Sequence, residues 1–455
     1  MPDSLFPIDP DLPASPPDAA PVPLAGTPRL RIPLRDQVRM RNAALDDLLE
    51  PDHTARIVWQ AVGGLDLDRW LRRVRAVEGH RGRDATDPRL LLALWVYATL
   101  DGVGSARELA RLCEKHLAYE WLCGEVPVNH HMLSDFRSQH IDDWNDLLTQ
   151  LVGSLMAEGL VTMNRVAQDG MKVRASAGKS SFRRKKTLER CLEEAREQVE
   201  TVTRLGDVDP KGLNERRRKA REQRRSERTE RVKKALEQCE ALQKQREERS
   251  KISGEKVKEA RASTTDPEAR VMQFSDNGYR PGWNVQFSTD TASGIVVGVD
   301  VTNAGNDAEQ LSPMLDELER RYGRRPSEVL VDGGFATKAG VAAADQKGCT
   351  LYGPLKEEQK QLDSGKDPYA AKPGDSVAMK SFRARMGTAA AKALYKLRCQ
   401  TAEWVNAMCR NRGLWQMPVR GRPKCRGVAL LHAITHDLLT AERLRQKADS
   451  ATVAG

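Results

Sequence analysis

Long hydrophobic runs are missing from this chain of 455 residues. The most apolar stretch, residues 90–100, is about half as long as a bilayer-spanning helix must be. The first 33 residues lack the charged start and apolar core of a secretory signal peptide, and they contain ten of the 23 prolines. The sequence therefore predicts a cytoplasmic protein with no membrane partner.

Cysteine patterns that would indicate disulfides or zinc are also missing. The eight cysteines, spread from Cys113 to Cys425, form no Cys-x-x-Cys pair and show no zinc-type spacing with histidine. We therefore expect reduced thiols, and neither a disulfide framework nor a metal cage built from cysteine.

Charge is abundant where apolar residues are few. Only 39% of the residues are hydrophobic and 30% are charged, so part of the chain must be solvated and not packed. The net charge of +10 suits a polyanionic partner, although charge alone says nothing about the fold. The length is sufficient for two or three domains with a sizeable core.

The N-terminal third shows two different patterns. Residues 1–35 are Pro-rich and are predicted to be a disordered tail. Residues 36–159 follow the spacing of short amphipathic helices, one of them starting at Ser105 with a capping box. Such helices predict either a DNA-binding helix-turn-helix domain, with Arg137 as a possible contact, or an all-α packing module.

After residue 159 the period changes to that of strands and longer helices. The order of elements predicts a mixed sheet flanked by helices over residues 160–440, with a flexible tail at 441–455. The predicted strands are 163–175, 284–290, 295–301, 328–332 and 350–352. The predicted helices between these strands are 307–322 and 337–346.

A segment of different composition, residues 181–262, interrupts the predicted sheet. Its residues 181–260 contain 25 Lys+Arg and 17 Asp+Glu, a net of +8. Apolar residues at coiled-coil spacing around a turn at 207–212 predict an inserted helical hairpin. It is interpreted as a contact with the DNA backbone or with a second subunit, or simply as a solvated arm. The candidate phosphate contacts are Arg216, Arg217, Arg218, Lys219, Arg224 and Arg225.

Three acidic residues stand beside distinctive local signatures. Asp169 lies in the first predicted strand, Asp332 ends a later strand before two glycines, and Glu403 lies on a basic helix predicted over 388–412. Each of them alone is unremarkable among the 64 acidic residues. Together, three carboxylates on two strands and a helix are what a two-metal phosphodiester-cutting site requires.

The helix that carries Glu403 also presents a tyrosine and two arginines. At about 100° per residue, Tyr395, Arg398 and Arg410 share one broad face with Glu403. One interpretation is a lattice of surface ion pairs, worth only about a few tenths of a kcal/mol. The other is a metal-binding carboxylate whose neighbours position the scissile phosphate.

The chain resembles the DDE transposases of bacterial insertion sequences, in the group whose glutamate helix carries a Tyr-x2-Arg … Glu-x6-Lys/Arg signature. The resemblance covers residues 40–440 and implies a ribonuclease-H-like catalytic fold. Its motifs here are Asp169 to Ala175, Thr265 to Arg270, Asn284 with Gln286, Asp332 to Phe335, Tyr395 with Arg398, Glu403 and Arg410, and Thr435 to Leu438. Two positions depart from the family: Arg410 often is Lys, and Asp437 usually is Asn.

The resemblance implies a mechanism and partners. Asp169, Asp332 and Glu403 would be both the catalytic residues and the ligands of two Mg²⁺ ions, for which Mn²⁺ can substitute. Tyr395, Arg398 and Arg410 would position DNA phosphates. The expected activity is cleavage of the transposon ends to a 3′-hydroxyl, followed by joining to target DNA.

The expected partner is double-stranded DNA, both terminal repeats and target, bound by a dimer on paired ends in association with the nucleoid. Two alternatives stay open at this point: a ribonuclease-H-like nuclease or resolvase without strand transfer, and a captured transposase that is a non-catalytic DNA-binding or coiled-coil protein.

Overall fold

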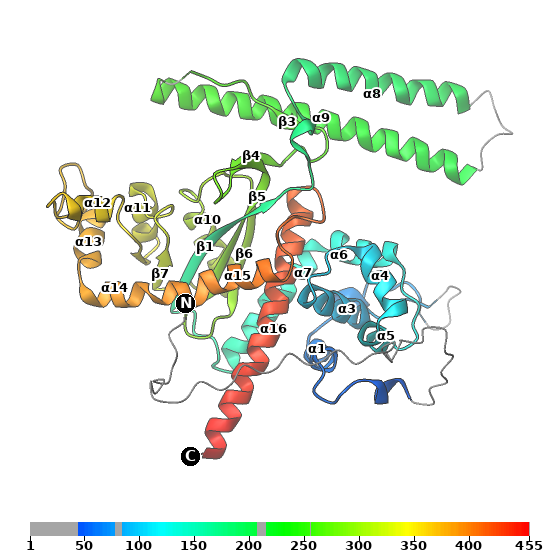
Figure 1. Ribbon diagram of the computed structural model, residues 1–455, viewed down its shortest axis with the longest axis horizontal. Helices are drawn as coiled ribbons and strands as arrows, with labels where there is room; N and C mark the ends of the chain where they lie inside the picture. The colour runs from blue at the N-terminus through cyan, green and yellow to red at the C-terminus, as the bar shows by residue number, and fades with distance from the viewer. Residues whose placement is uncertain (1–43, 78–83, 207–214, 255, 455) are drawn as a thin grey trace, which may run out of the picture. The chain divides into compact units, whose positions relative to one another are not determined.

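The structure, a computed structural model, describes residues 44–77, 84–206, 215–254 and 256–454 (Figure 1). It describes only the backbone at 201–206, 215–221, 253 and 451–454. The predicted disordered tail 1–35 and the predicted turn at 207–212 lie outside the described residues. Within the described residues, no helix is both long and apolar enough to cross a membrane.

Residues up to 157 form a cluster of short helices around a buried one. Helix α3 begins where the Asp87 side chain accepts a hydrogen bond from the Arg89 amide, with Pro88 at its first position. It is buried on nearly every side, which is why its sequence is apolar all round. The helices are α1 (Thr54–Gly63), α2 (Asp68–Leu71), α3 (Pro88–Leu100), α4 (Ala106–Lys115), α5 (Leu117–Cys123), α6 (His130–Gln139) and α7 (Ile141–Ala157), after the 3-10 turn η1 (Leu45–Leu48).

A six-stranded mixed sheet follows, with strand β5 pairing antiparallel to three neighbours. The path of the sheet is β4-β5-β1-β7-β8, and β6 also pairs with β5. Strands β1, β7 and β8 are mutually parallel. The bounds are β1 (Arg165–Arg174), β4 (Arg270–Gln273), β5 (Tyr279–Asp290), β6 (Val296–Thr302), β7 (Glu328–Val331) and β8 (Thr350–Tyr352). The predicted β5–β6 hairpin and the predicted strands 328–332 and 350–352 are confirmed.

Helices flank the sheet and connect its strands. Helix α10 (Leu311–Tyr322) ends at Gly323, as the sequence predicted. The φ of Gly323 is 67°, a conformation that glycine adopts easily because it has no Cβ. Helix α11 (Lys338–Gln346) starts at Thr337, which accepts a hydrogen bond from the Gly340 amide. The later helices are α12 (Glu358–Asp363), α13 (Val377–Met386), α14 (Ala389–Tyr395), α15 (Trp404–Asn411) and α16 (Arg422–Ala454).

Helix α16 joins the helical cluster to the sheet. It packs against β6 and also against α3 and α7. One continuous apolar core therefore runs from Leu49 to Ala441, so the predicted boundary at residue 159 does not separate two cores. The helix also continues through residues 441–454, where we expected a flexible tail. There Ala441 is buried and Arg445 pairs with Glu158 at 2.8 Å.

The charged segment forms two long helices, α8 (Lys185–Gly206) and α9 (Glu215–Ser253), which pack side by side (Figure 1). Their base is closed by a 3-10 turn, η2 (Lys179–Ser181), and by strand β2 (Phe182–Arg183), which pairs antiparallel with β3 (Ala262–Ser263). Their core is small and separate from the main one, and consists of Leu188, Ala235, Cys239, Ala260 and Ala262. A bond of 2.6 Å from Arg270 on β4 to Gln238 ties α9 to the sheet.

Candidate active site

The strand register brings Asp169 and Asp332 side by side. Strands β1 and β7 are parallel, and Gln168 lies opposite Val331. Asp169 and Asp332 are the next residues on each chain, and neighbouring strands are about 4.8 Å apart. The Asp332 carboxylate is turned back on its own loop, where Oδ1 accepts a hydrogen bond from the Gly334 amide at 2.8 Å. Two acids far apart in the sequence are thus neighbours at one edge of the site.

The helix expected over 388–412 is present, but it is not regular: a π-helical turn, η3 (Cys399–Glu403), lies between α14 and α15. A π-turn pairs residues five apart, so the 100° spacing assumed for an α-helix does not hold across it. Arg398 and Glu403, five residues apart, face each other, with Nη1 at 2.5 Å from Oε1. Such single π-turns often mark functional sites.

Arg398 connects two of the three acids. Its Nη2 lies 3.0 Å from Asp169 Oδ1, while Nη1 donates to Glu403. Asp169 is also held by two neutral donors: the Gly170 amide at 3.0 Å and Asn406 Nδ2 at 2.9 Å. Asp169 and Arg398 are each 9% exposed, whereas the Glu403 side chain is 47% exposed. The buried acid is rigidly held, and the exposed one lies at the mouth of the site.

The electrostatics of the cluster favour a cation. Burial raises the pKa of Asp169; Arg398 acts in the opposite direction, and the negative charge of Asp332 adds to the increase. Burial also raises the pKa of the Tyr395 phenol, which lies within the influence of Arg398, Asp332 and Glu403. Neighbouring carboxylates that repel one another are the donors that small divalent cations prefer.

A metal would compete with Arg398 for these oxygens. Among the described residues, no three Asp, Glu, His or Cys side chains converge closely enough to hold one metal ion. The Arg398 guanidinium stands between Asp169 and Glu403 and pairs with both. The donor chemistry therefore fits Mg²⁺, provided that Arg398 releases the carboxylates.

Two family models match the chain. The model described as "Transposase domain (DUF772)" matches residues 43–139, and the model described as "Transposase DDE domain" matches residues 261–436. The chain belongs to the insertion-sequence DDE transposases. Its general function is DNA transposition, and as a member of this family it is a DNA-binding enzyme of the nuclease or transferase kind. Comparison with curated proteins and with solved structures found no match.

The structure adds a second layer of site residues that the sequence alone did not single out. Asn406 lies one turn beyond Glu403 and fixes Asp169 Oδ2. Asp307, in the loop before α10, accepts hydrogen bonds from Asn284 and Gln286 at 2.7 Å each. In the sequence, the family-like Asn284-x-Gln286 motif indicated that these two side chains belong to the site, but it did not show that Asp307 is their hydrogen-bond partner.

Gly170 leaves the room that this layer needs in the transposase. A Cβ built at Gly170 would lie 2.3 Å from Asp307 Oδ1 and 2.5 Å from Gln286 Nε2. Real Cβ atoms do not approach other atoms so closely. Any other residue at position 170 would therefore push the hydrogen-bonded side chains of Asp307 and Gln286 away from strand β1. At residues 169–170, Asp169 supplies the carboxylate, and Gly170, which has no side chain, lets Asp307 and Gln286 lie directly against strand β1.

Two other arginines that were predicted to contact DNA, Arg137 and Arg410, lie in different surroundings. Arg137 is 6% exposed, donates to the Gly104 carbonyl and lies over the Trp95 ring at 4.1 Å. The expectation that it contacts DNA is therefore corrected, because Arg137 lies on the face of α6 that packs into the core. Arg410 is half-buried, and none of the described residues forms an ion pair with it.

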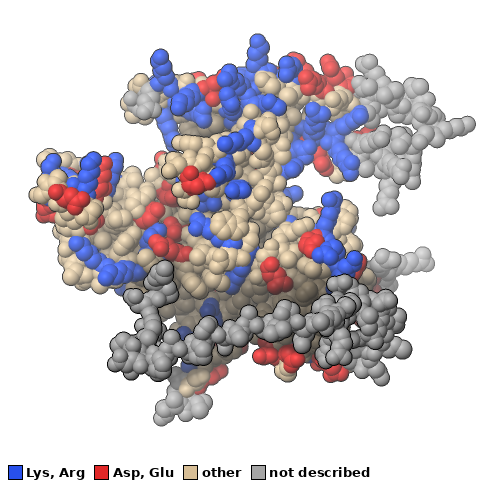
Figure 2. All heavy atoms as spheres, in the orientation of Figure 1, with Lys and Arg blue, Asp and Glu red and all other residues tan. Residues whose placement is uncertain are grey.

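In the hairpin, Arg224 is exposed, while Arg225 donates to the Gln198 carbonyl and so links α9 to α8. The side chains of Arg216, Arg217, Arg218 and Lys219 lie outside the described residues. Lys and Arg side chains gather over α8 and α9 on the face shown in Figure 2.

Proposed function

We propose that this transposase cuts the ends of its insertion sequence to give a 3′-hydroxyl and joins that hydroxyl to target DNA by two-metal transesterification. The supporting observation is the arrangement of Asp169, Asp332 and Glu403, which come from β1, the end of β7 and the π-turn. A ribonuclease-H-like fold and membership in the Tyr-x2-Arg … Glu-x6-Lys/Arg group belong to the same proposal. So do the predicted limits of the hairpin insertion, residues 181–262.

The three acids would hold two Mg²⁺ ions, or Mn²⁺ in their place. When bound, these ions would supply charge neutralisation for the attacking and the leaving oxygens of the phosphodiester. Asn406 and the Gly170 amide hold Asp169 in place throughout. A preorganised site requires such a fixed carboxylate, because a metal ligand that moves freely binds the ion more weakly and must be ordered again before each reaction.

Arg398 would exchange partners during the reaction. In the structure its guanidinium neutralises Asp169 and Glu403. An arginine can grip a phosphate with two parallel hydrogen bonds, so on DNA binding it would turn from the carboxylates to the phosphate being cut. Tyr395 and Arg410 would hold the neighbouring strand. A dimer on two paired ends is part of the proposal.

The reaction has two chemically similar steps. In the first, a water oxygen bonds to phosphorus, the bond from phosphorus to the 3′-oxygen breaks, and the leaving oxygen takes up a proton. In the second, the oxygen of the freed 3′-hydroxyl bonds to a phosphorus of the target and gives up its proton, the bond from that phosphorus to the 3′-oxygen of the target breaks, and the leaving oxygen takes up a proton. One set of acids can serve both steps, because each step exchanges one oxygen on phosphorus for another.

A cleavage and strand-transfer assay on DNA carrying the element's ends, with and without Mg²⁺, tests this function. Asp332→Asn should lower the rate of nicking by at least about 10²-fold, the size typical for losing one electrostatic group of an active site. The control is Asp345→Asn, an exposed acid on α11, which should leave the rate unchanged. Normal nicking by Asp332→Asn would refute the assignment. DNA binding by the wild type without cleavage would favour a captured, non-catalytic protein.

A further inference from the structure

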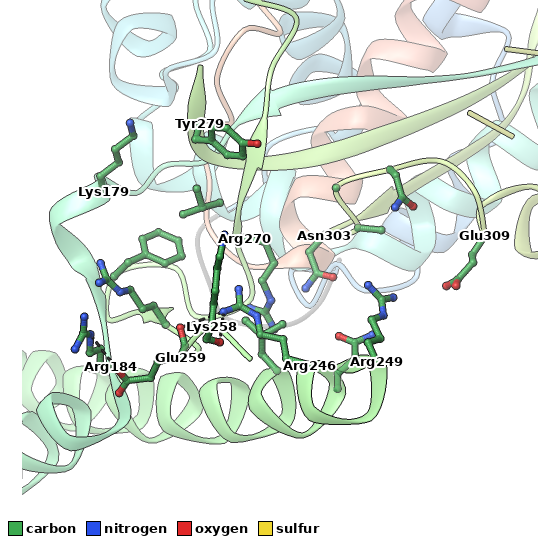
Figure 3. Close-up of a pocket in the computed structure, with 18 residues that line it drawn as sticks. Lys179, Arg184, Arg246, Arg249, Lys258, Glu259, Arg270, Tyr279, Asn303 and Glu309 are labelled. Carbon is green, nitrogen blue, oxygen red and sulfur yellow. Dashed lines mark hydrogen bonds and ion pairs between the residues drawn. The ribbon is translucent and has the colours of Figure 1, made fainter. Parts of the chain in front are cut away.

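A basic groove lies between the helical hairpin and the edge of the sheet (Figure 3). Its volume is about 930 Å³. One wall is the second half of α9, the opposite wall is formed by the start of β4 and β5 with Tyr279, and loop 303–309 lies at one end. The Tyr279 ring, 57% exposed, stands at its rim.

The groove has far more positive than negative charge. Seven Lys or Arg side chains line it, against two acids, Glu259 and Glu309. Arg184 pairs with Glu259 at 3.1 Å. Lys179, Arg249, Lys258 and Arg261 are exposed, and within the described chain no carboxylate pairs with any of them. These four charges are available to a ligand.

Two further arginines are held in place beneath them. Arg246 Nη1 donates to the backbone carbonyls of Lys258 and Glu259, at 2.9 and 3.0 Å. Arg270 is anchored to Gln238. Burial, with the nearby Arg246 charge adding, lowers the pKa of Arg270. Crowding cations without an equal number of acids costs free energy, which a bound polyanion would recover.

The groove shares a wall with the candidate active site. Asn303 and Glu309, at the two ends of loop 303–309, line the groove (Figure 3), and so does Asn306. The same loop turns Asp307 to the other side, where it binds Asn284 and Gln286 and lies against Gly170, the neighbour of Asp169. A polymer lying in the groove would therefore pass close to the acids.

We infer that this groove binds the sugar–phosphate backbone of duplex DNA and guides it toward the acid cluster. The inference rests on the proposed function only in taking DNA as the substrate. A backbone with one negative charge per nucleotide suits a groove with four cations that no described carboxylate pairs with, and release of counterions makes such contacts favourable. Of these cations, Arg249 comes from α9, and Lys179, Lys258 and Arg261 come from the segments at the base of the hairpin. Phosphates carry no sequence information, so the groove would contribute affinity and register but not specificity.

The test compares two triple variants of the full-length protein with equal loss of charge. The groove variant is Arg249→Ala/Lys258→Ala/Arg261→Ala. The control variant is Lys233→Ala/Lys244→Ala/Lys251→Ala, which removes exposed lysines of α9 that do not line the groove. The binding of two fluorescent duplexes, one with the element's end and one unrelated, is measured by anisotropy over a range of salt concentrations.

For the groove variant we expect weaker binding of both duplexes and a salt dependence, d log K/d log[salt], shallower by about 2 to 3, since each lost phosphate contact removes about 0.9. The control variant should keep the wild-type slope. An unchanged slope in the groove variant, or an equal change in the control, would overturn the inference. Weaker binding of only the duplex with the element's end would also overturn it, because that would indicate recognition of bases. So would unchanged DNA binding together with a changed sedimentation coefficient of the groove variant, which would indicate that a second copy of the protein occupies the groove.

The two proposals can fail separately. If the groove variant binds like the wild type while cleavage still depends on Asp332, the groove assignment falls and the function stands. If the wild type neither binds nor cuts DNA, both fall. Circular dichroism and thermal unfolding of each variant show whether it is folded, and the substituted side chains are all exposed.

Discussion

The acid cluster and the helical hairpin use charge in opposite ways. Asp169 and Arg398 are buried, each has a named partner, and both lie at the edge of one large apolar core. The hairpin has a core of five buried residues, and most of its charges are exposed. In the first region each charge has a fixed partner; in the second, most of the described charges face solvent, and those that line the groove are the ones that we expect to contact a ligand. This difference predicts different responses to mutation.

The largest contrast concerns stability. Phe287→Ala in the sheet and Leu188→Ala in the hairpin should each cost about 2–5 kcal/mol, because both side chains are fully buried. Phe287→Ala should lower the stability of the whole transposase, whereas Leu188→Ala should open only α8 and α9. Hydrogen exchange of backbone amides separates the two. Equal loss of protection across the sheet in Leu188→Ala would show that the hairpin and the sheet are one cooperative unit.

The acid cluster should be sensitive to a single charge. Arg398→Met should lower the rate of cleavage by about 10–100-fold, the range typical for residues that support metal ligands. It should also lower the Mg²⁺ concentration that gives half the maximal rate, because the guanidinium no longer competes for Asp169 and Glu403. Arg445→Met, which removes an exposed arginine paired with Glu158, serves as the control. A purely structural role would leave the Mg²⁺ dependence unchanged.

A smaller effect is expected from a buried acid far from the chemistry. Asp437 on α16 is fully buried; Oδ1 accepts from the Val296 amide at 2.8 Å, and Oδ2 has no partner among the described residues. Burial raises the pKa of Asp437 well above its usual value. The folded state therefore holds this proton more tightly than the unfolded state does, and stability falls as the pH rises above the unfolded pKa.

Asp437→Asn should remove this penalty. We expect a gain of about 1–3 kcal/mol at neutral pH, the cost of a buried group left unsatisfied, and a gain that vanishes below about pH 4, where the unfolded carboxyl is protonated. Urea unfolding at several pH values measures it, with exposed Asp449→Asn as the control. A pH-independent difference would contradict the assignment.

Much of the fold could be predicted because it is encoded locally. The alternation before Arg174, the turn between β5 and β6, and the glycine at 323 each determine the backbone within a few residues. Asp169, Asp332 and Glu403 could be selected because each stands beside a strand end or a family-like motif. The parallel register of β1 and β7 places Asp169 beside Asp332, whereas Glu403 is placed by the π-turn.

What could not be predicted depends on contacts between distant segments. A helical periodicity of 3.6 residues does not predict the π-turn at 399–403, and this turn brings Arg398 opposite Glu403. Arg137 has the sequence context of a surface arginine, yet it lies over Trp95 in the core. Asp307 became a site residue only because Gly170 leaves room for it.

The sequence by itself determined the elements, the excess of positive charge in residues 181–260 and the three acids, since propensity, charge and chemistry belong to individual residues. The tertiary structure alone decided which partner each charge has: Arg398 for two of the acids, Asn284 and Gln286 for Asp307, and, among the described residues, no carboxylate for the groove cations Lys179, Arg249, Lys258 and Arg261. The reason is physical. A side chain's partner depends on distance in space, and packing, not chain order, sets that distance.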